Sequence, residues 1–137
     1  MSLKLRAGLE QLSQIREYAI ESATALGVVP SAFDDVRLAV DEAVTNIITH
    51  GYGGPGDIEL DLTTKGPDLI VRLRDQAPPF DLAFAPPTDL SPPGERDNPG
   101  GFGVFLMQSV MDNIAHQATK TGNELTMIKL NVVRVPP

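Results

Sequence analysis

The stretch LAVDEAVTNIITHG, residues 38–51, carries the pattern on which the fold prediction for this chain depends most. Its apolar residues recur at the spacing of a helix that buries one face: Ala39, Val40, Ala43, Val44, Ile47 and Ile48. Its polar residues form a second stripe along the same helix: Glu42, Asn46, Thr49 and His50. Such a stripe either lines a site or is an ordinary solvated face, and the rest of the sequence bears on the choice.

The composition bounds the class of protein. With 137 residues the chain is long enough for one domain, residues 1–137, with a substantial core. The net charge of −7 argues against nucleic-acid and membrane partners, although backbone N–H groups of an acidic chain still bind phosphates. The chain has no cysteine, no signal-peptide pattern and no membrane-spanning apolar run, so we expect a cytoplasmic protein.

Helical and strand patterns alternate on both sides of this stretch. Helical spacing predicts helices over residues 9–26, from the N-cap Ser31 to Gly51, and from Val104 onward. Period-two alternation predicts strands over residues 2–6, 58–63, 69–75, 114–120 and 124–133. This order favours an α/β (α+β) two-layer sandwich, with about three helices on one face of a mostly antiparallel, mixed sheet.

One charged residue falls on the buried side of a predicted strand. Asp75 is in phase with Leu69, Val71 and Leu73, so it points toward the core at the end of its strand. A core-facing carboxylate is costly unless something hydrogen-bonds it. Asp75 therefore either serves a ligand or starts the turn that follows.

A proline-rich segment, residues 76–99, is typical of a functional lid or a disordered connection. It leads into the run GGFG, residues 100–103, just before a predicted helix. Glycines at a helix N-terminus let backbone N–H groups approach a phosphate, although a flexible hinge has the same composition. No Gly-Lys-Ser/Thr follows and no strand immediately precedes, which excludes a Walker loop and a Rossmann fingerprint.

Glu42 and Asn46 lie one helical turn apart, which places a candidate general base near a candidate oxygen ligand for Mg²⁺. The alternative is an ordinary polar helix face. His50, at the end of the helix, has no assigned role. His50 and His116 are too few and too isolated to argue for a zinc site.

Three segments together resemble the GHKL superfamily of ATP-binding domains, which includes histidine kinases, gyrase, Hsp90 and MutL. EAVTNIITH (42–50) resembles the N box, DQAPPFD (75–81) the first glycine box, and GGFGVFLM (100–107) the second. The AVDEA opening, the PPFD ending of the first box and the run MDNI (111–114) are most similar to the stand-alone anti-sigma-factor serine kinases of bacteria. The resemblance implies the Bergerat ATP-binding fold.

The resemblance also implies a role for each motif residue. Glu42 would act as general base, Asn46 would hold Mg²⁺ against the triphosphate of ATP, and Asp75 would accept a hydrogen bond from the adenine amino group. Further nucleotide contacts would come from both glycine boxes: Ala77, Gly101, Phe102, Gly103 and Val104.

Two positions complicate this picture. Ala77 stands where the first box usually has glycine, so a position that requires positive φ or close approach to the nucleotide would be strained. Arg96 is the only arginine between Asp75 and Gly100, and the lid sequence does not assign it a role.

The resemblance implies an anti-sigma-factor-type serine/threonine kinase that uses Mg-ATP. Such a protein sequesters a sigma factor and phosphorylates an antagonist protein of the STAS type, and a homodimer is expected. The first alternative is a module of the same fold that switches partners on binding nucleotide, with little or no kinase activity. The second is an interaction domain that does not use ATP.

Overall fold

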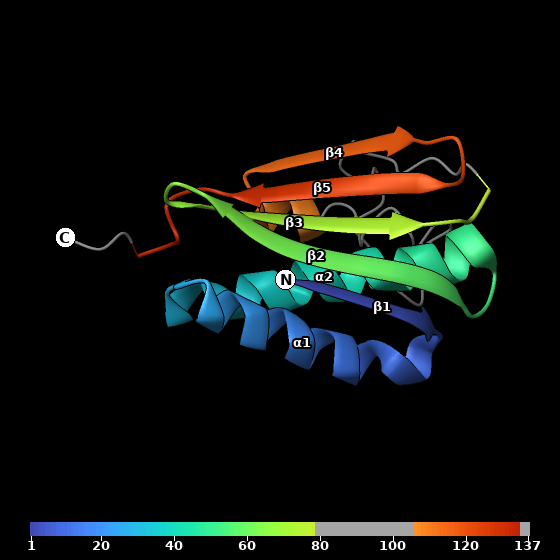
Figure 1. The fold of residues 1–137 in the computed structure, drawn as a ribbon, viewed down its shortest axis with the longest axis horizontal. Coiled ribbons are helices and arrows are strands. Elements are labelled where there is room, and N and C mark those ends of the chain that lie inside the picture. The colour runs from blue at the N-terminus through green and yellow to red at the C-terminus, as the bar shows by residue number, and fades with distance from the viewer. Residues whose placement is uncertain (79–105, 135–137) are drawn as a thin grey trace, which may run out of the picture.

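The computed structural model describes residues 1–78 and 106–134, which form two layers (Figure 1). One layer is a five-stranded sheet with the strand order β1-β2-β3-β5-β4. Its strands are β1 (Ser2–Ala7), β2 (Gly56–Lys65), β3 (Asp68–Asp75), β4 (Asn113–Ala118) and β5 (Asn123–Lys129). The other layer contains α1 (Leu12–Ala25), which follows the 3₁₀ turn η1 (Leu9–Gln11), α2 (Phe33–Asn46) and a helical turn at residues 106–110. The predicted two-layer sandwich is confirmed.

Every strand pair in the described part of the chain is antiparallel. The predicted hairpin turn joins β2 to β3, where Lys65 pairs with Asp68. β5 forms a second hairpin with β4 and pairs along its other edge with β3. The mixed character predicted for the sheet is therefore wrong. Strands joined by tight turns run antiparallel, and the long connection after β3 leads to β4, which does not pair with β3.

The core lies between the sheet and the helices. Alternate residues of the central strands are fully buried there, including Leu60, Leu73 and Met127. The apolar stripe predicted within residues 38–51 faces the same core, and each of its residues is at most 3% exposed. Burial of each larger aliphatic side chain contributes roughly 1.5–3 kcal/mol, so this stripe fixes which side of α2 faces the sheet.

The start of α2 differs from the prediction. A 3₁₀ turn, η2 (Pro30–Ala32), precedes the helix, whose N-cap is Ala32 without a side-chain hydrogen bond. The capping role predicted for Ser31 is therefore wrong, because Ser31 lies inside the 3₁₀ turn rather than at the helix boundary. Asp34 and Asp35 in the first turn of α2 still interact favourably with the helix dipole.

The end of α2 continues into a π-helix, η3 (Ile47–Tyr52). Gly51, the predicted end of the helix, lies inside η3. The helix ends instead at Gly53, whose φ of +69° is the left-handed conformation that glycine adopts without steric cost. The last strand, β5, also ends earlier than predicted, and Val133 forms an isolated bridge with Val28.

Three segments that are far apart in the sequence meet at one end of the molecule. The end of η3, the end of β3 and the start of β5 all lie on the right in Figure 1. The predicted site residues of α2 and β3 therefore lie on elements that converge there. Among the described residues no helix is both long and apolar enough to cross a membrane.

Candidate functional site

Asp75 ends β3 on the buried side of the sheet, as predicted, and is 6% exposed. Its Oδ1 accepts hydrogen bonds from the Ala77 backbone N–H (2.9 Å) and from Asn123 Nδ2 (2.9 Å). These bonds fix the carboxylate and offset the cost of burying it. The described part of the chain offers it no other hydrogen bond, so Oδ2 keeps its acceptor capacity for a ligand.

Asn123 is a functional candidate that was not identified from the sequence. It is 2% exposed and lies directly opposite Asp75 in the β3–β5 pairing. Its Nδ2 also lies 3.2 Å from the Ala77 carbonyl oxygen and 3.4 Å from that of Pro78. Its Oδ1 is buried and has no hydrogen-bond partner among the described residues. Asn123 thus fixes the turn after β3 and keeps one acceptor unused.

Ala77 is buried within this turn and is 2% exposed. Its N–H donates to Asp75 and its carbonyl oxygen accepts from Asn123. Among the described non-glycine residues only Asn131 has a positive φ, so Ala77 does not adopt the left-handed conformation. The strain that a positive φ would impose on alanine at this position is therefore absent.

The polar stripe predicted along α2 divides in two. Asn46 is 5% exposed and Glu42, one turn earlier, is partly buried. Thr49 and His50 are exposed, and Thr49 Oγ1 donates to the Thr45 carbonyl oxygen (2.7 Å). The π-helix begins directly after Asn46, and its wider turns change the direction in which later side chains point. Only Glu42 and Asn46 of the predicted stripe therefore remain candidates for one site.

Burial raises the pKa of the Glu42 carboxyl above its usual value, and the neighbouring Asp41 carboxylate raises it further. Asp41 faces α1, where its Oδ1 lies 3.4 Å from Arg16 Nε. A carboxylate with a raised pKa is a stronger base toward a hydroxyl group than an ordinary surface glutamate. Glu42 therefore has the electrostatic environment of a general base.

A metal ion at Asn46 would be held by few protein atoms. Within residues 1–78 and 106–134 there is no group of three or more His, Asp or Glu side chains arranged to hold a metal ion. Asn46 Nδ2 is buried without a hydrogen-bond partner in these residues, so the protein does not saturate this amide. This unpaired atom is a donor, whereas the atom that would bind Mg²⁺ is Asn46 Oδ1. An amide oxygen suits Mg²⁺, which commonly keeps waters and binds substrate phosphates, so Asn46 stays a candidate ligand.

The remaining predicted contacts lie outside the described residues. They are Gly101, Phe102, Gly103 and Val104 of the second glycine box, together with Arg96 and residues 79–99 of the lid. Met107, the last residue of the box, and Met111 are 0% and 5% exposed and belong to the core. These two side chains anchor the helical turn at residues 106–110.

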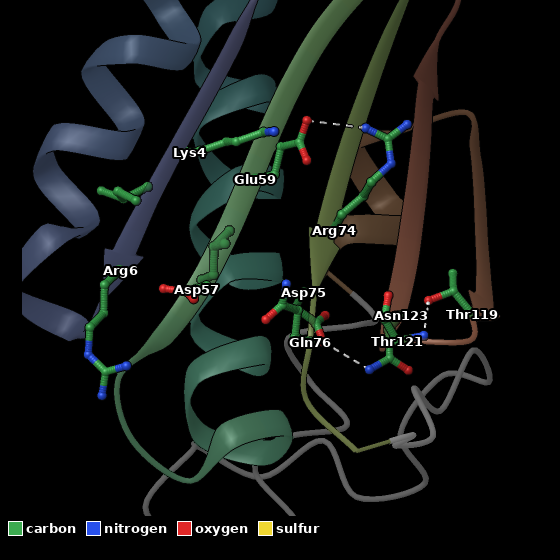
Figure 2. Close-up of a pocket in the computed structure, with 12 residues that line it drawn as sticks. Lys4, Arg6, Asp57, Glu59, Arg74, Asp75, Gln76, Thr119, Thr121 and Asn123 are labelled. Carbon is green, nitrogen blue, oxygen red and sulfur yellow. Dashed lines mark hydrogen bonds and ion pairs between the residues drawn. The ribbon is translucent and has the colours of Figure 1, made fainter.

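A hollow of about 460 Å³ at this end of the sheet is lined by Glu59 and Arg74, and also by Asp75 and Asn123. Figure 2 shows it with α2 behind the strands. Arg74 lines this hollow and pairs with Glu124 (2.8 Å) and Glu59 (3.6 Å), so its charge is already compensated. Arg74 and Asp75 are consecutive strand residues, and their side chains point to opposite faces of the sheet. We therefore place the candidate site on the side that faces the helices.

Comparison with known proteins identifies relatives over most of the chain. Residues 5–129 match the model of the family described as histidine kinase-like ATPase domain. The chain is 31% identical over 120 residues to the serine-protein kinase RsbW of Listeria monocytogenes serovar 1/2a. This alignment covers 83% of this chain and 76% of the relative. It is 32% identical over 134 residues to the anti-sigma F factor of Clostridium acetobutylicum, and this alignment covers 94% of this chain and 92% of the relative.

Solved structures share the fold. The RsbU and RsbW domains of a Mycobacterium tuberculosis protein align with a TM-score of 0.60 and 15% identity, over 95% of this chain and 32% of that one. A blue-light-activated histidine kinase of Erythrobacter litoralis aligns with a TM-score of 0.56 and 17% identity, over 93% of this chain and 42% of that one. This chain thus spans less than half of either structure. The family match over residues 5–129 shows that the chain belongs to the histidine kinase-like ATPase domain family.

Proposed function

We propose that this chain is a Mg-ATP-dependent serine/threonine-protein kinase of the anti-sigma-factor type. It would sequester a sigma factor and phosphorylate an antagonist protein. The names of the relatives, a serine-protein kinase and an anti-sigma factor, support both parts of the proposal. The geometry supports the kinase part, because Glu42 and Asn46 lie one turn apart on α2, the Glu42 carboxyl is partly buried and Asn46 Nδ2 has no hydrogen-bond partner among the described residues.

The observation that carries the kinase proposal is the environment of Glu42. Phosphoryl transfer to a serine needs a group that accepts the hydroxyl proton while the oxygen bonds to the γ-phosphorus of ATP. At the same time the bond from that phosphorus to the β–γ bridging oxygen breaks, and ADP leaves. Glu42 takes the proton, and its raised pKa makes it a better acceptor than an ordinary glutamate.

Asp75 is the proposed adenine acceptor. Its Oδ1 is committed to Ala77 and Asn123, which leaves Oδ2 to accept a hydrogen bond from the adenine amino group. A fixed and buried acceptor discriminates strongly, because a base without a donor at this position leaves the carboxylate unpaired. Ala77 lies in the same turn and would pack against the base.

Asn46 is the proposed ligand for Mg²⁺, which supplies neutralisation of triphosphate charge when bound. The backbone between Gly101 and Val104, just before the helical turn at residues 106–110, would hold the phosphates. Together these parts position the γ-phosphoryl group and shield its charge, which is most of what phosphoryl transfer requires.

The proposed partners are proteins rather than nucleic acid or membrane. They are a sigma factor and a STAS-type antagonist, and the kinase would act as a homodimer in the cytoplasm, where transcription takes place. The net charge of −7 agrees with protein partners that present basic or neutral surfaces.

Incubation with labelled ATP, Mg²⁺ and candidate antagonist proteins tests the proposal. We expect label on a serine or threonine of one antagonist, and loss of transfer when Mg²⁺ is removed with a chelator. Calorimetry with ADP in parallel measures nucleotide binding alone. Binding without transfer to any antagonist would exclude the kinase and leave the nucleotide-dependent binding module. No binding at millimolar nucleotide would exclude both.

A further inference from the structure

Tyr52, the last residue of η3, lies where the helix that carries Glu42 and Asn46 meets the turn that carries Asp75. We propose that Tyr52 is a positioning residue that links these two parts of the site and sets the selectivity for adenine. The inference rests on the proposed function, because it concerns how Asp75 is presented to a nucleotide base. None of the sequence motifs assigned Tyr52 a role.

The Tyr52 hydroxyl bridges the ends of two strands. It donates to the Asp57 carbonyl oxygen of β2 (2.5 Å) and accepts from the Gln76 backbone N–H (2.7 Å). Gln76 is the residue between Asp75 and Ala77, so this second bond holds the peptide from which the Asp75–Ala77 turn is built. The other side of the turn is held by Asn123.

The phenol keeps its proton at physiological pH. Burial is the main cause that raises the pKa of Tyr52 above its usual value, and the hydrogen bond from Gln76 opposes it. The carboxylates of Asp75 and Asp57 raise the pKa further, and Arg6 lowers it. A protonated hydroxyl donates and accepts at once, which is what the bridge between Asp57 and Gln76 requires.

The backbone around Tyr52 is shaped to receive its ring. A Cβ atom at Gly56 would overlap the Tyr52 ring, so the ring packs directly against the backbone at the start of β2. The π-helix and the left-handed Gly53 at its end turn the chain back toward this strand, and the Gly54 N–H donates to the Ile48 carbonyl oxygen (2.9 Å). π-Helical turns are frequent at functional sites.

These contacts form a continuous path through the site. Asn46 directly precedes η3, Tyr52 ends it, and the Tyr52 hydroxyl bonds the residue next to Asp75. A displacement of the turn after β3 therefore has to break the bond to Tyr52. The path couples the element proposed to bind metal and phosphate to the element proposed to bind the base.

Tyr52→Phe tests the inference because it removes both hydrogen bonds and keeps the ring on Gly56. Tyr18→Phe is the matched control, since Tyr18 is the other tyrosine of the chain and lies on α1. The readout is the ratio of the dissociation constants for inosine diphosphate and ADP. Inosine carries an oxygen where adenosine carries the amino group, so the ratio reports the hydrogen bond to Asp75.

We expect Tyr52→Phe to weaken ADP binding by about three- to tenfold and inosine diphosphate binding little, so that the ratio falls. Hydrogen exchange at the Gln76 amide should rise by a similar factor, and Tyr18→Phe should change neither quantity. A second variant, Gln76→Pro, removes the donor and keeps the tyrosine. Both changes break the hydrogen bond from the Gln76 N–H to the Tyr52 hydroxyl, so their effects should not add, and the double variant should be no less selective than the less selective single variant.

The outcomes separate this inference from the proposed function. A wild-type protein that binds neither nucleotide contradicts the proposed function. A wild-type protein that prefers ADP, with an unchanged ratio in folded Tyr52→Phe and Gln76→Pro, overturns the positioning role. Equal weakening of both nucleotides in Tyr52→Phe also overturns it, because Tyr52 would then act only as a structural brace.

Discussion

Two regions of the site differ in how far their buried polar groups are hydrogen-bonded. In the Asp75 end, defined by Asp75, Ala77 and Asn123, the side chains and the turn bond one another, and only Asn123 Oδ1 is buried without a partner among the described residues. In the α2 face, defined by Glu42 and Asn46, the Asn46 amide is buried without a partner among the described residues. Glu42 is partly desolvated beside the carboxylate of Asp41.

This difference indicates which half of the site is preorganised before the nucleotide binds. A fixed, hydrogen-bonded acceptor at the Asp75 end costs little when a base arrives, because its orientation is set by folding. The α2 face is destabilising on its own, since buried polar groups without partners cost free energy that a bound ligand recovers. Recognition would thus be preorganised, and the reactive groups would be completed by Mg-ATP.

The largest expected effect comes from removing the reactive group of the α2 face. Glu42→Gln keeps the size of the side chain and abolishes its basicity, so phosphoryl transfer should fall by about 10²–10⁴-fold. The affinity for ADP should change by less than about threefold, because a general base acts in the transition state. Initial rates of label transfer and calorimetry measure the two quantities.

Glu21→Gln is the control for this change, because Glu21 is exposed on α1 and its replacement removes the same charge from the chain. It should leave both quantities unchanged. Equal transfer by Glu42→Gln and the wild type would contradict the general-base role and mean that the α2 face is an ordinary polar helix surface.

The next effect concerns recognition at the Asp75 end. Asp75→Asn replaces an acceptor by an amide whose NH₂ group faces the donors of Ala77 and Asn123 or the adenine amino group. ADP affinity should fall by about 10- to 100-fold, as expected for a hydrogen bond to a buried charged group. Calorimetry on the folded variant measures this. Asp57→Asn, on an exposed side chain of β2, is the control and should bind normally; a normal affinity in Asp75→Asn would contradict the adenine assignment.

A smaller effect tests how the Asp75 end is built. A Cβ atom at Gly122 would overlap the Asp75 carbonyl oxygen, whereas one at Gly54 would meet no atom within 4 Å. Gly122→Ala should therefore lower the free energy of unfolding by about 1–3 kcal/mol, and Gly54→Ala should be nearly neutral. Thermal unfolding of both variants measures the difference. Equal stabilities would mean that β5 moves away from β3 without cost.

The parts of this site that local patterns encode were predictable. Period-two alternation placed Asp75 on the buried side, and helical spacing placed the apolar stripe of α2 in the core. The segment that resembles the N box and the described residues 75–78 of the first glycine box lie on elements that converge at one end of the molecule.

The parts that depend on pairing between distant segments were not predictable. Asn123 faces Asp75 only because β5 pairs with β3, across a separation of 48 residues. The role of Gly122 follows from the same pairing. The π-helix that aims Tyr52 depends on tertiary contacts, since no propensity distinguishes it from the α-helix before it. The split of the polar stripe after Asn46 has the same origin.

The smallest expected effect is a shift of the pH dependence, and it tests whether the charge of Asp41 reaches the α2 face. A general base acts only when deprotonated, so transfer falls as the pH drops through the pKa of Glu42 in the folded protein. Because burial and Asp41 raise this pKa above 4.5, the acid limb should lie at higher pH than an ordinary glutamate would give. The pH profile of single-turnover transfer measures the limb.

Two variants should move this limb in opposite directions. Asp41→Asn removes a like charge, so the pKa of Glu42 falls and the limb shifts to lower pH. Arg16→Met removes the cation 3.4 Å from Asp41, so the uncompensated carboxylate raises the pKa and the limb shifts to higher pH. Shifts in the same direction would mean that both variants act through the packing of α1 on α2. Opposite shifts would show that the α2 face is tuned by charge from its neighbouring helix, whereas the Asp75 end is set by hydrogen bonds alone.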